Sequence, residues 1–137
     1  MKRARLLLVL LVLAATVGVL RVVGAVGSDS APARLTGSGE RYAVSIALVP
    51  ARTGVVEADL DVASGGVPAA AGTVVSLSAA MPSMGHAMPE IAAEPERPGR
   101  FRARGEFFAM PGAWELTIRI HGAAGADAVT IGISVQR

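Results

Sequence analysis

One short segment of this sequence, residues 81–89, gathers side chains that could bind a soft metal ion. It reads Met-Pro-Ser-Met-Gly-His-Ala-Met-Pro and holds three of the five methionines and one of the two histidines of the chain. Thioether sulfur and imidazole nitrogen are ligands suited to Cu(I), whereas hard ions prefer oxygen. The chain contains no cysteine. Binding of a soft metal must therefore rely on methionine and histidine.

A fourth internal methionine is expected to lie close to this segment. In an antiparallel β protein the connections alternate between the two ends, and Met110 immediately precedes a predicted turn at Pro111-Gly112. Counting strands places Met110 at the same end as the segment and His121 at the opposite end. The count depends on a weakly marked strand around residues 87–93; without it, Met110 moves to the other end. The candidate metal ligands are Met81, Met84, His86, Met88 and Met110.

Each candidate also has a purely structural interpretation. Met81 follows the alternation of the apolar residues before it, which favours packing in the core. The loop methionines would equally well form an apolar lid over the open end of the fold. Met110 is out of phase with the apolar residues of the preceding strand, as is Phe108, and a β-bulge would explain both. Trp114 has the alternation of a central core residue.

The segments around these residues alternate apolar and polar side chains with the period of a half-buried strand. Turn signals rich in Pro and Gly separate them, and no helical period occurs after residue 20. With the weak segment at 87–93, these segments predict an all-β fold, an antiparallel β-sandwich of about seven strands. The six clear segments are 42–48, 56–62, 75–81, 101–107, 114–120 and 129–135.

The N-terminus predicts export. Three basic residues precede an apolar run over residues 6–20, which is typical of a signal peptide. Fifteen residues span only ~22 Å as a helix, but extension to Val26 would allow a single membrane anchor. Both alternatives stay open, and both place the following domain outside the cytoplasm. We expect three parts: a signal peptide or anchor at 1–26, a flexible tether at 27–40 and the β domain at 41–137.

Charge and composition exclude several classes of function. The chain has 13 Lys and Arg against 11 Asp and Glu, but four of the basic residues precede residue 27, so the exported part is close to neutral. Nucleic-acid binding therefore has no support. Neither a glycine-rich phosphate loop nor a Ser-His-acid set is evident, and we expect the protein not to be an enzyme.

Three motifs resemble those of a known family when taken together. They are the Met/His segment, Pro98-Gly99-Arg100-Phe101, and Met110-Pro111-Gly112-Ala113-Trp114-Glu115-Leu116. Their spacing is similar to that of the YtkA-like domain, which overlaps with proteins called FixH-like, over roughly residues 41–137. The resemblance implies an immunoglobulin-like sandwich, exported and often anchored. It maps the Met-x-x-Met-x-His loop of the family onto Met81, Met84 and His86, with Met88 as an addition, and a later methionine onto Met110.

The resemblance also implies a link to copper handling and to the assembly of respiratory oxidases or their copper supply. We therefore expect an extracytoplasmic copper-binding protein, a Cu(I) chaperone or buffer, whose partners are the copper ion and a protein that receives it. The alternative is a metal-independent interaction module that docks on a membrane complex through an adaptable methionine surface. The membrane would be a further partner through residues 1–26 if they are not cleaved.

Overall fold

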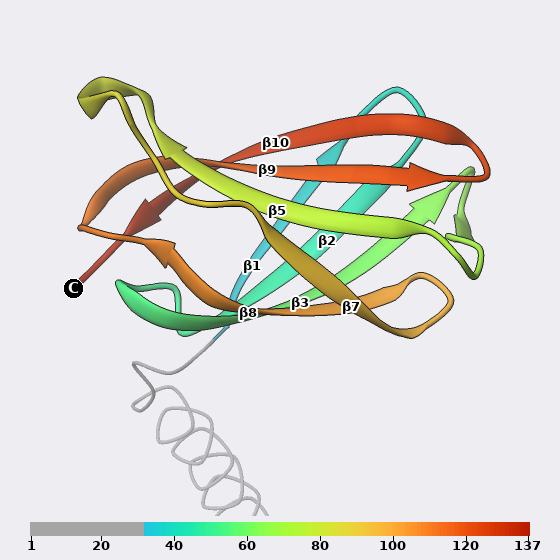
Figure 1. Cartoon of the computed structure of the whole chain (residues 1–137), viewed down its shortest axis with the longest axis horizontal. Coiled ribbons are helices and arrows are strands. Elements are labelled where there is room, and N and C mark those ends of the chain that lie inside the picture. Colours follow the sequence, from blue (N-terminus) through green and yellow to red (C-terminus); the bar gives the residue numbers. More distant parts are fainter. Residues whose placement is uncertain (1–31) are drawn as a thin grey trace, which may run out of the picture.

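Ten antiparallel strands make up most of residues 32–137, the part of the chain that the computed structural model describes. Within this range the only helical element is a short 3₁₀ turn, η1 (Pro82–Met84), and no helix is long and apolar enough to cross a membrane. The strands, shown in Figure 1, are β1 (Ala33–Ser38), β2 (Ala43–Val49), β3 (Gly54–Ser64), β4 (Val67–Pro68), β5 (Val74–Met81), β6 (His86–Ala87), β7 (Ile91–Arg97), β8 (Arg100–Phe108), β9 (Gly112–Gly122) and β10 (Gly125–Val135).

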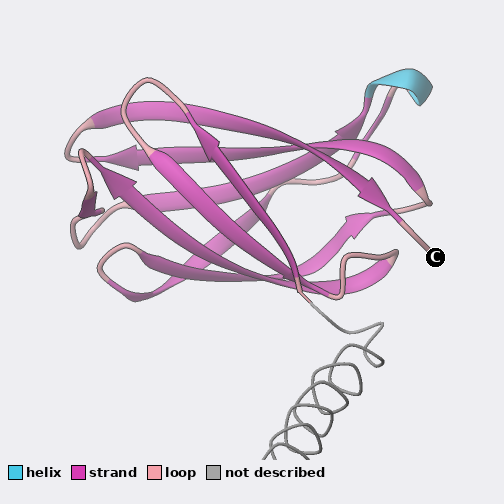
Figure 2. Cartoon of the chain, turned by 180° about the vertical axis from the view of Figure 1, so that it is seen from behind, coloured by secondary structure: helices cyan, strands magenta, loops and turns pink. Residues whose placement is uncertain are grey.

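The strands form two facing layers that β7 joins into one continuous sheet. The order is β1-β2-β3-β8-β7-β5-β9-β10, with β4 added to β3 and β6 added to β5. The first half of β7 pairs with β5 and its second half pairs with β8, so this strand passes from one layer to the other. On the side of the sheet away from β7, one isolated β-bridge among the described residues, between Arg52 and Gln136, links the two layers. The result is an antiparallel sheet that is nearly a closed barrel (Figures 1 and 2).

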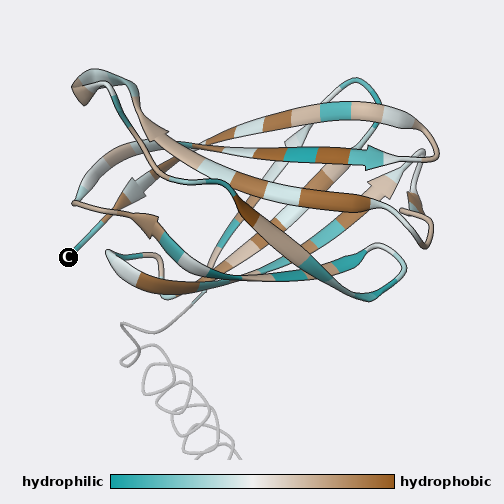
Figure 3. Ribbon diagram, in the orientation of Figure 1, coloured by the Kyte–Doolittle hydropathy of each residue, from teal (hydrophilic) through white to brown (hydrophobic). Residues whose placement is uncertain are grey.

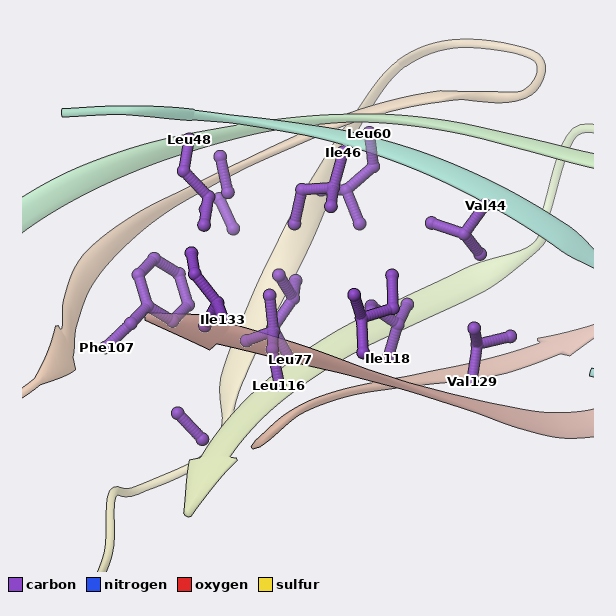
Figure 4. Packing of buried hydrophobic residues seen from close by; sticks show 14 of the residues in the cluster. Val44, Ile46, Leu48, Leu60, Leu77, Phe107, Leu116, Ile118, Val129 and Ile133 are labelled. Carbon is purple, nitrogen blue, oxygen red and sulfur yellow. The ribbon is translucent and has the colours of Figure 1, made fainter. Parts of the chain in front are cut away.

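The core lies between the layers, where every second residue of each long strand points inward. Along the strands of Figure 3 the hydropathy alternates accordingly. Figure 4 shows the side chains of β2 and β3 facing those of β5, β9 and β10 across the interior. The largest fully buried side chains are aromatic, and they include Trp114, Phe101, Phe107 and Phe108. Burial of this apolar surface is the main term that stabilises the fold.

The all-β, antiparallel prediction is confirmed, and the strand count is corrected from about seven to ten. The six clear segments are all strands. The segment at 87–93 is divided between β6 and β7, and β7 continues to Arg97. β4 and β6 are two residues long, too short for alternation to reveal.

The first strand lies where the sequence predicted a flexible tether. Residues 33–38 form β1 and pair along their whole length with β2, so the tether prediction is wrong for these residues. Ala33, Leu35 and Gly37 point inward, but Gly37 interrupts the apolar row because it packs directly against Val129 and Ile131 of β10. The predicted signal peptide or anchor at 1–26 and the first five residues of the tether lie outside the described residues.

A ladder of ion pairs covers the outer face of β3 and β8. Three acidic residues of β3 stand directly opposite three arginines of β8 in the register of the sheet. The pairs are Glu57 with Arg104, Asp59 with Arg102, and Asp61 with Arg100, at 3.7, 2.9 and 2.6 Å. The acidic row and the basic row therefore match each other residue by residue. Opposite charges directly across a strand pair favour this register over a shifted one.

A carboxylate of β10 fastens the turn between β1 and β2. Asp127 accepts hydrogen bonds from the backbone N–H groups of Arg41 and Tyr42 at 2.7 and 3.0 Å, and from its own neighbour Ala128 at 2.9 Å. These donors, the N–H of Arg41 foremost, hold the pKa of Asp127 below its usual value. Gly39 lies so close to this carboxylate that a side chain would collide with it. We call these hydrogen bonds the Asp127 latch. They tie the turn after β1 to β10, where the two edge strands of the sheet face each other.

Candidate functional site

The Met/His segment folds back on the end of β5 through a tight turn. Pro82 begins η1, and Gly85 ends it with a positive φ of 60°, where its N–H donates to the carbonyl of Pro82 at 3.2 Å. Glycine adopts this left-handed conformation without strain. The chain then returns as β6, which pairs with β5 so that His86 stands directly opposite Met81. Directly opposed residues of an antiparallel pair project from the same face, so the turn brings a thioether and an imidazole together.

Met88 extends this arrangement by one step. Its backbone N–H donates to the carbonyl of Ala79 at 2.8 Å, which continues the pairing with β5 beyond the end of β6. Because side chains alternate along a strand, Met88 shares the face of His86. Met88 is half-buried and packs against the core, whereas His86 is exposed. The three side chains Met81, His86 and Met88 therefore follow one face of β5 and its return strand.

Trp114 connects this face to the turn that carries Met110. Its indole N–H donates to the carbonyl of Met110 at 2.9 Å. Its ring meets the imidazole of His86 in an edge-on contact, with 6.0 Å between ring centroids and 82° between planes. The half-buried Met110 also packs against the core. The turn before β9 and the turn after β5 accordingly lie at the same end of the barrel, as Figure 1 shows.

Met81 forms the inner wall of this cluster. Its side chain is 4 % exposed, and its methyl group lies only 2.9 Å from where a Cβ of Gly112 would be. Gly112 also has a φ of +139°, a conformation that other residues rarely adopt. Glycine at this position thus lets the start of β9 pass close to the thioether. Met81 combines both interpretations made from the sequence: it belongs to the core and also borders the cluster.

The structure therefore brings four of the five candidate residues to one cluster and leaves the fifth at its tip. Met81, His86 and Met88 lie along the end of β5 and its return strand, and Met110 lies in the turn before β9, where its carbonyl accepts from Trp114. Met84 lies on η1, the projecting turn seen at the upper left of Figure 1 and in cyan in Figure 2, and is 66 % exposed. His121, expected at the opposite end, pairs with Val74 at the start of β5 and is remote from the cluster.

A β-bulge in β8 explains why Phe108 and Met110 do not follow the alternation of the apolar residues before them. The register of β8 against β3 shifts between Gly54 and Val55, whose partners are Phe108 and Glu106. Two successive residues, Phe107 and Phe108, are consequently both buried. The bulge inferred from the sequence is thus confirmed. It also places Phe108 against Trp114, with 5.7 Å between the ring centroids.

The candidate metal ligands at this end are thioethers and one imidazole. Glu90, the acid closest to the segment in sequence, is engaged on the outer face by Ser76 of β5 and by Arg119 of β9. Both interactions, the hydrogen bond from Ser76 first, lower the pKa of Glu90. Within residues 32–137 no group of three or more His, Asp or Glu side chains is arranged to hold a metal ion. The cluster therefore suits a cation that accepts thioether and imidazole ligands, and hard cations lack the oxygen ligands they prefer.

The sequence missed the contribution of Trp114 to this end of the molecule. Its alternation correctly indicated a core residue, and the side chain is only 1 % exposed. A signal was present, since Trp114 follows Met110 by four residues across a Pro-Gly turn, a spacing that lets an indole reach back over the turn. No protein-family model, curated protein or solved structure matches the chain.

Proposed function

We propose that this protein binds Cu(I) outside the cytoplasm and acts as a copper chaperone or buffer. The observation that carries the proposal is the meeting of Met81, His86, Met88 and Met110 at one end of the barrel, from two turns far apart in sequence. Several thioethers with one imidazole form a ligand set suited to Cu(I). In an oxidising compartment thioethers offer soft ligands that do not form disulfides.

The different exposure of the ligands suits transfer of the ion. His86 is exposed and Met88 and Met110 are half-buried, so an ion could reach the cluster from solvent. Met84 projects beyond it and is 66 % exposed. A thioether in that position would meet an incoming or departing ion first and would be accessible to the ligands of a receiving protein. In this proposal copper is the cargo that the protein carries, and the protein does not use it for catalysis.

We also propose a family for the fold. An immunoglobulin-like sandwich of the YtkA-like or FixH-like type agrees with the two facing antiparallel layers, whose order and near closure are described above. Residues 1–26 would serve as a cleaved signal or a retained anchor. A respiratory oxidase, or a protein that delivers copper to it, is the proposed recipient.

A competition titration tests copper binding. The full chain, in detergent solution, is titrated with Cu(I) against a chromophoric chelator, alongside a Met84→Ala, His86→Ala double variant. We expect the wild type to withdraw one equivalent of Cu(I) and the double variant to withdraw much less while its circular dichroism stays unchanged. A His121→Ala variant is the matched control, because this second histidine lies at the opposite end and should leave affinity unaltered. Equal affinity in the wild type and the double variant would contradict the proposal.

One observation favours a second function, docking without metal. Met84 protrudes beside a shallow groove between η1 and the outer face of β9 and β10, lined by Pro82, Ser83, Glu115 and Ser134 among others. Exposed methionines adapt to varied apolar partners. This alternative predicts that a membrane complex co-purifies with the chain in the presence of a Cu(I) chelator and also with His86→Ala. Loss of the complex under either condition would exclude it.

A further inference from the structure

Trp114 contacts both segments that carry the candidate ligands. Its ring packs edge-on against His86, which lies on the return strand after η1, and its N–H binds the carbonyl of Met110 in the turn before β9. These segments are separated by 24 residues in sequence, and no hydrogen bond between His86 and Met110 joins them directly among the described residues. The indole is thus a rigid link between the two halves of the cluster.

We propose that Trp114 is the positioning residue of the copper site, which fixes Met110 relative to His86 before the ion arrives. This inference rests on the proposed function and adds to it a residue that does not itself coordinate copper. A metal site gains affinity when its ligands are already held in place, because less conformational entropy is lost on binding. Preorganised ligands would favour retention of the ion, and the exposed Met84 would favour its release.

Packing alone does not account for the choice of tryptophan here. Phe108 already lies next to this position, and phenylalanine would fill an apolar space without a buried polar atom. A buried indole N–H requires an acceptor, and here that acceptor is the carbonyl of Met110. The hydrogen bond therefore constrains the Met110 turn in a way that phenylalanine would not.

A double-mutant cycle on Cu(I) affinity tests this role. Trp114→Phe keeps an aromatic ring against His86 and Phe108 but removes the N–H, and Met110→Leu removes the thioether with little change in shape. We expect Trp114→Phe to weaken Cu(I) binding about fivefold, the equivalent of one hydrogen bond. In the Met110→Leu background the same change should have almost no effect, because the ligand that the hydrogen bond positions is absent.

The outcomes separate this inference from the proposed function. No competition for Cu(I) by the wild type would overturn both. Tight binding by the wild type with unchanged affinity in Trp114→Phe would overturn only the positioning role. Additive losses in the double variant would also overturn it, since they would mean that Trp114 acts on general stability. A loss in Trp114→Phe that disappears in the Met110→Leu background would support it.

A second readout uses the wild type and does not depend on the folding of any variant. Trp114 is the sole tryptophan of the chain, so it gives one indole N–H signal in a ¹H–¹⁵N NMR spectrum. Addition of one equivalent of Cu(I) should shift this signal together with the ring protons of His86, and Met110→Leu should reduce the indole shift. An indole signal that stays in place while the His86 protons shift would contradict the link between the two segments.

Discussion

The latch formed by Asp127 should be a measurable contributor to stability. Asp127→Ala removes the acceptor of three backbone N–H groups. Two of these belong to the exposed residues Arg41 and Ala128, where water can replace the carboxylate at little cost. The third belongs to Tyr42, which is 4 % exposed. Leaving one buried donor without a partner costs ~1–3 kcal/mol, so we expect the free energy of unfolding to fall by about 2 kcal/mol at pH 7.

The same latch should depend on pH in a defined direction. The pKa of Asp127 is lowered in the folded state, so the unfolded chain binds the proton more tightly. The stabilisation is therefore complete above the unfolded pKa of about 3.9 and is lost as the pH falls through the lower folded pKa. The difference between wild type and Asp127→Ala should be constant from pH 7 to about 5 and should shrink below pH 4.

Urea unfolding followed by the fluorescence of Trp114, which is buried, measures both effects. Asp61→Ala is the matched control, because this carboxylate is 58 % exposed and its ion pair with Arg100 should contribute ~1 kcal/mol or less. If Asp127→Ala lowers the free energy of unfolding by less than ~0.5 kcal/mol at pH 7, the N–H of Tyr42 does not depend on this carboxylate, contrary to the prediction. If Asp127→Ala lowers the free energy of unfolding by the same amount at pH 3 and at pH 7, the charge of Asp127 does not contribute.

Three further predictions concern the strand register and the Met cluster. Exchange of the charges in an Asp59→Arg, Arg102→Asp double variant should recover most of the stability that each single variant loses, as measured by urea unfolding, because the two residues stand opposite each other. Gly112→Ala should destabilise the fold by about 1–3 kcal/mol in the same assay, through its positive φ and its contact with Met81. Dilute hydrogen peroxide should oxidise Met84 well before Met81, since their exposures are 66 % and 4 %, and peptide mass spectrometry would show the order.

Much of the fold could be predicted because alternation is a strong signal in long, half-buried strands. It located the six main strands and the buried face that carries Leu77 and Trp114. Alternation did not reveal β1. Gly37 interrupts its apolar row because β10 leaves no room for a side chain there, and this contact lies far away in sequence. Alternation also could not show that β7 leaves one layer for the other, since that path is set by pairing with β5 and β8 and not by its own residues.

The sequence predicted which end of the fold carries the candidate residues, but not how they are arranged there. Strand counting placed Met110 and His86 at one end because antiparallel connections alternate, and the structure has them there. The pairing of Met81 with His86 depends on the geometry of η1, and the link through Trp114 depends on the orientation of a buried ring. The spacing of Met110 and Trp114 gives a hint of their contact, but the contacts of His86 with Met81 and Trp114 arise from packing between segments and have no pattern along the chain.

X-ray absorption spectroscopy of the full chain loaded with one equivalent of Cu(I) shows which atoms bind the ion. We expect an edge typical of Cu(I) and a coordination shell that contains sulfur together with one imidazole nitrogen, with the nitrogen lost in His86→Ala. In a chain without cysteine, sulfur ligands can only come from methionine. A first shell of nitrogen and oxygen alone, or failure of the chain to retain copper, would contradict the assignment of the Met81, His86, Met88 and Met110 cluster as a copper site.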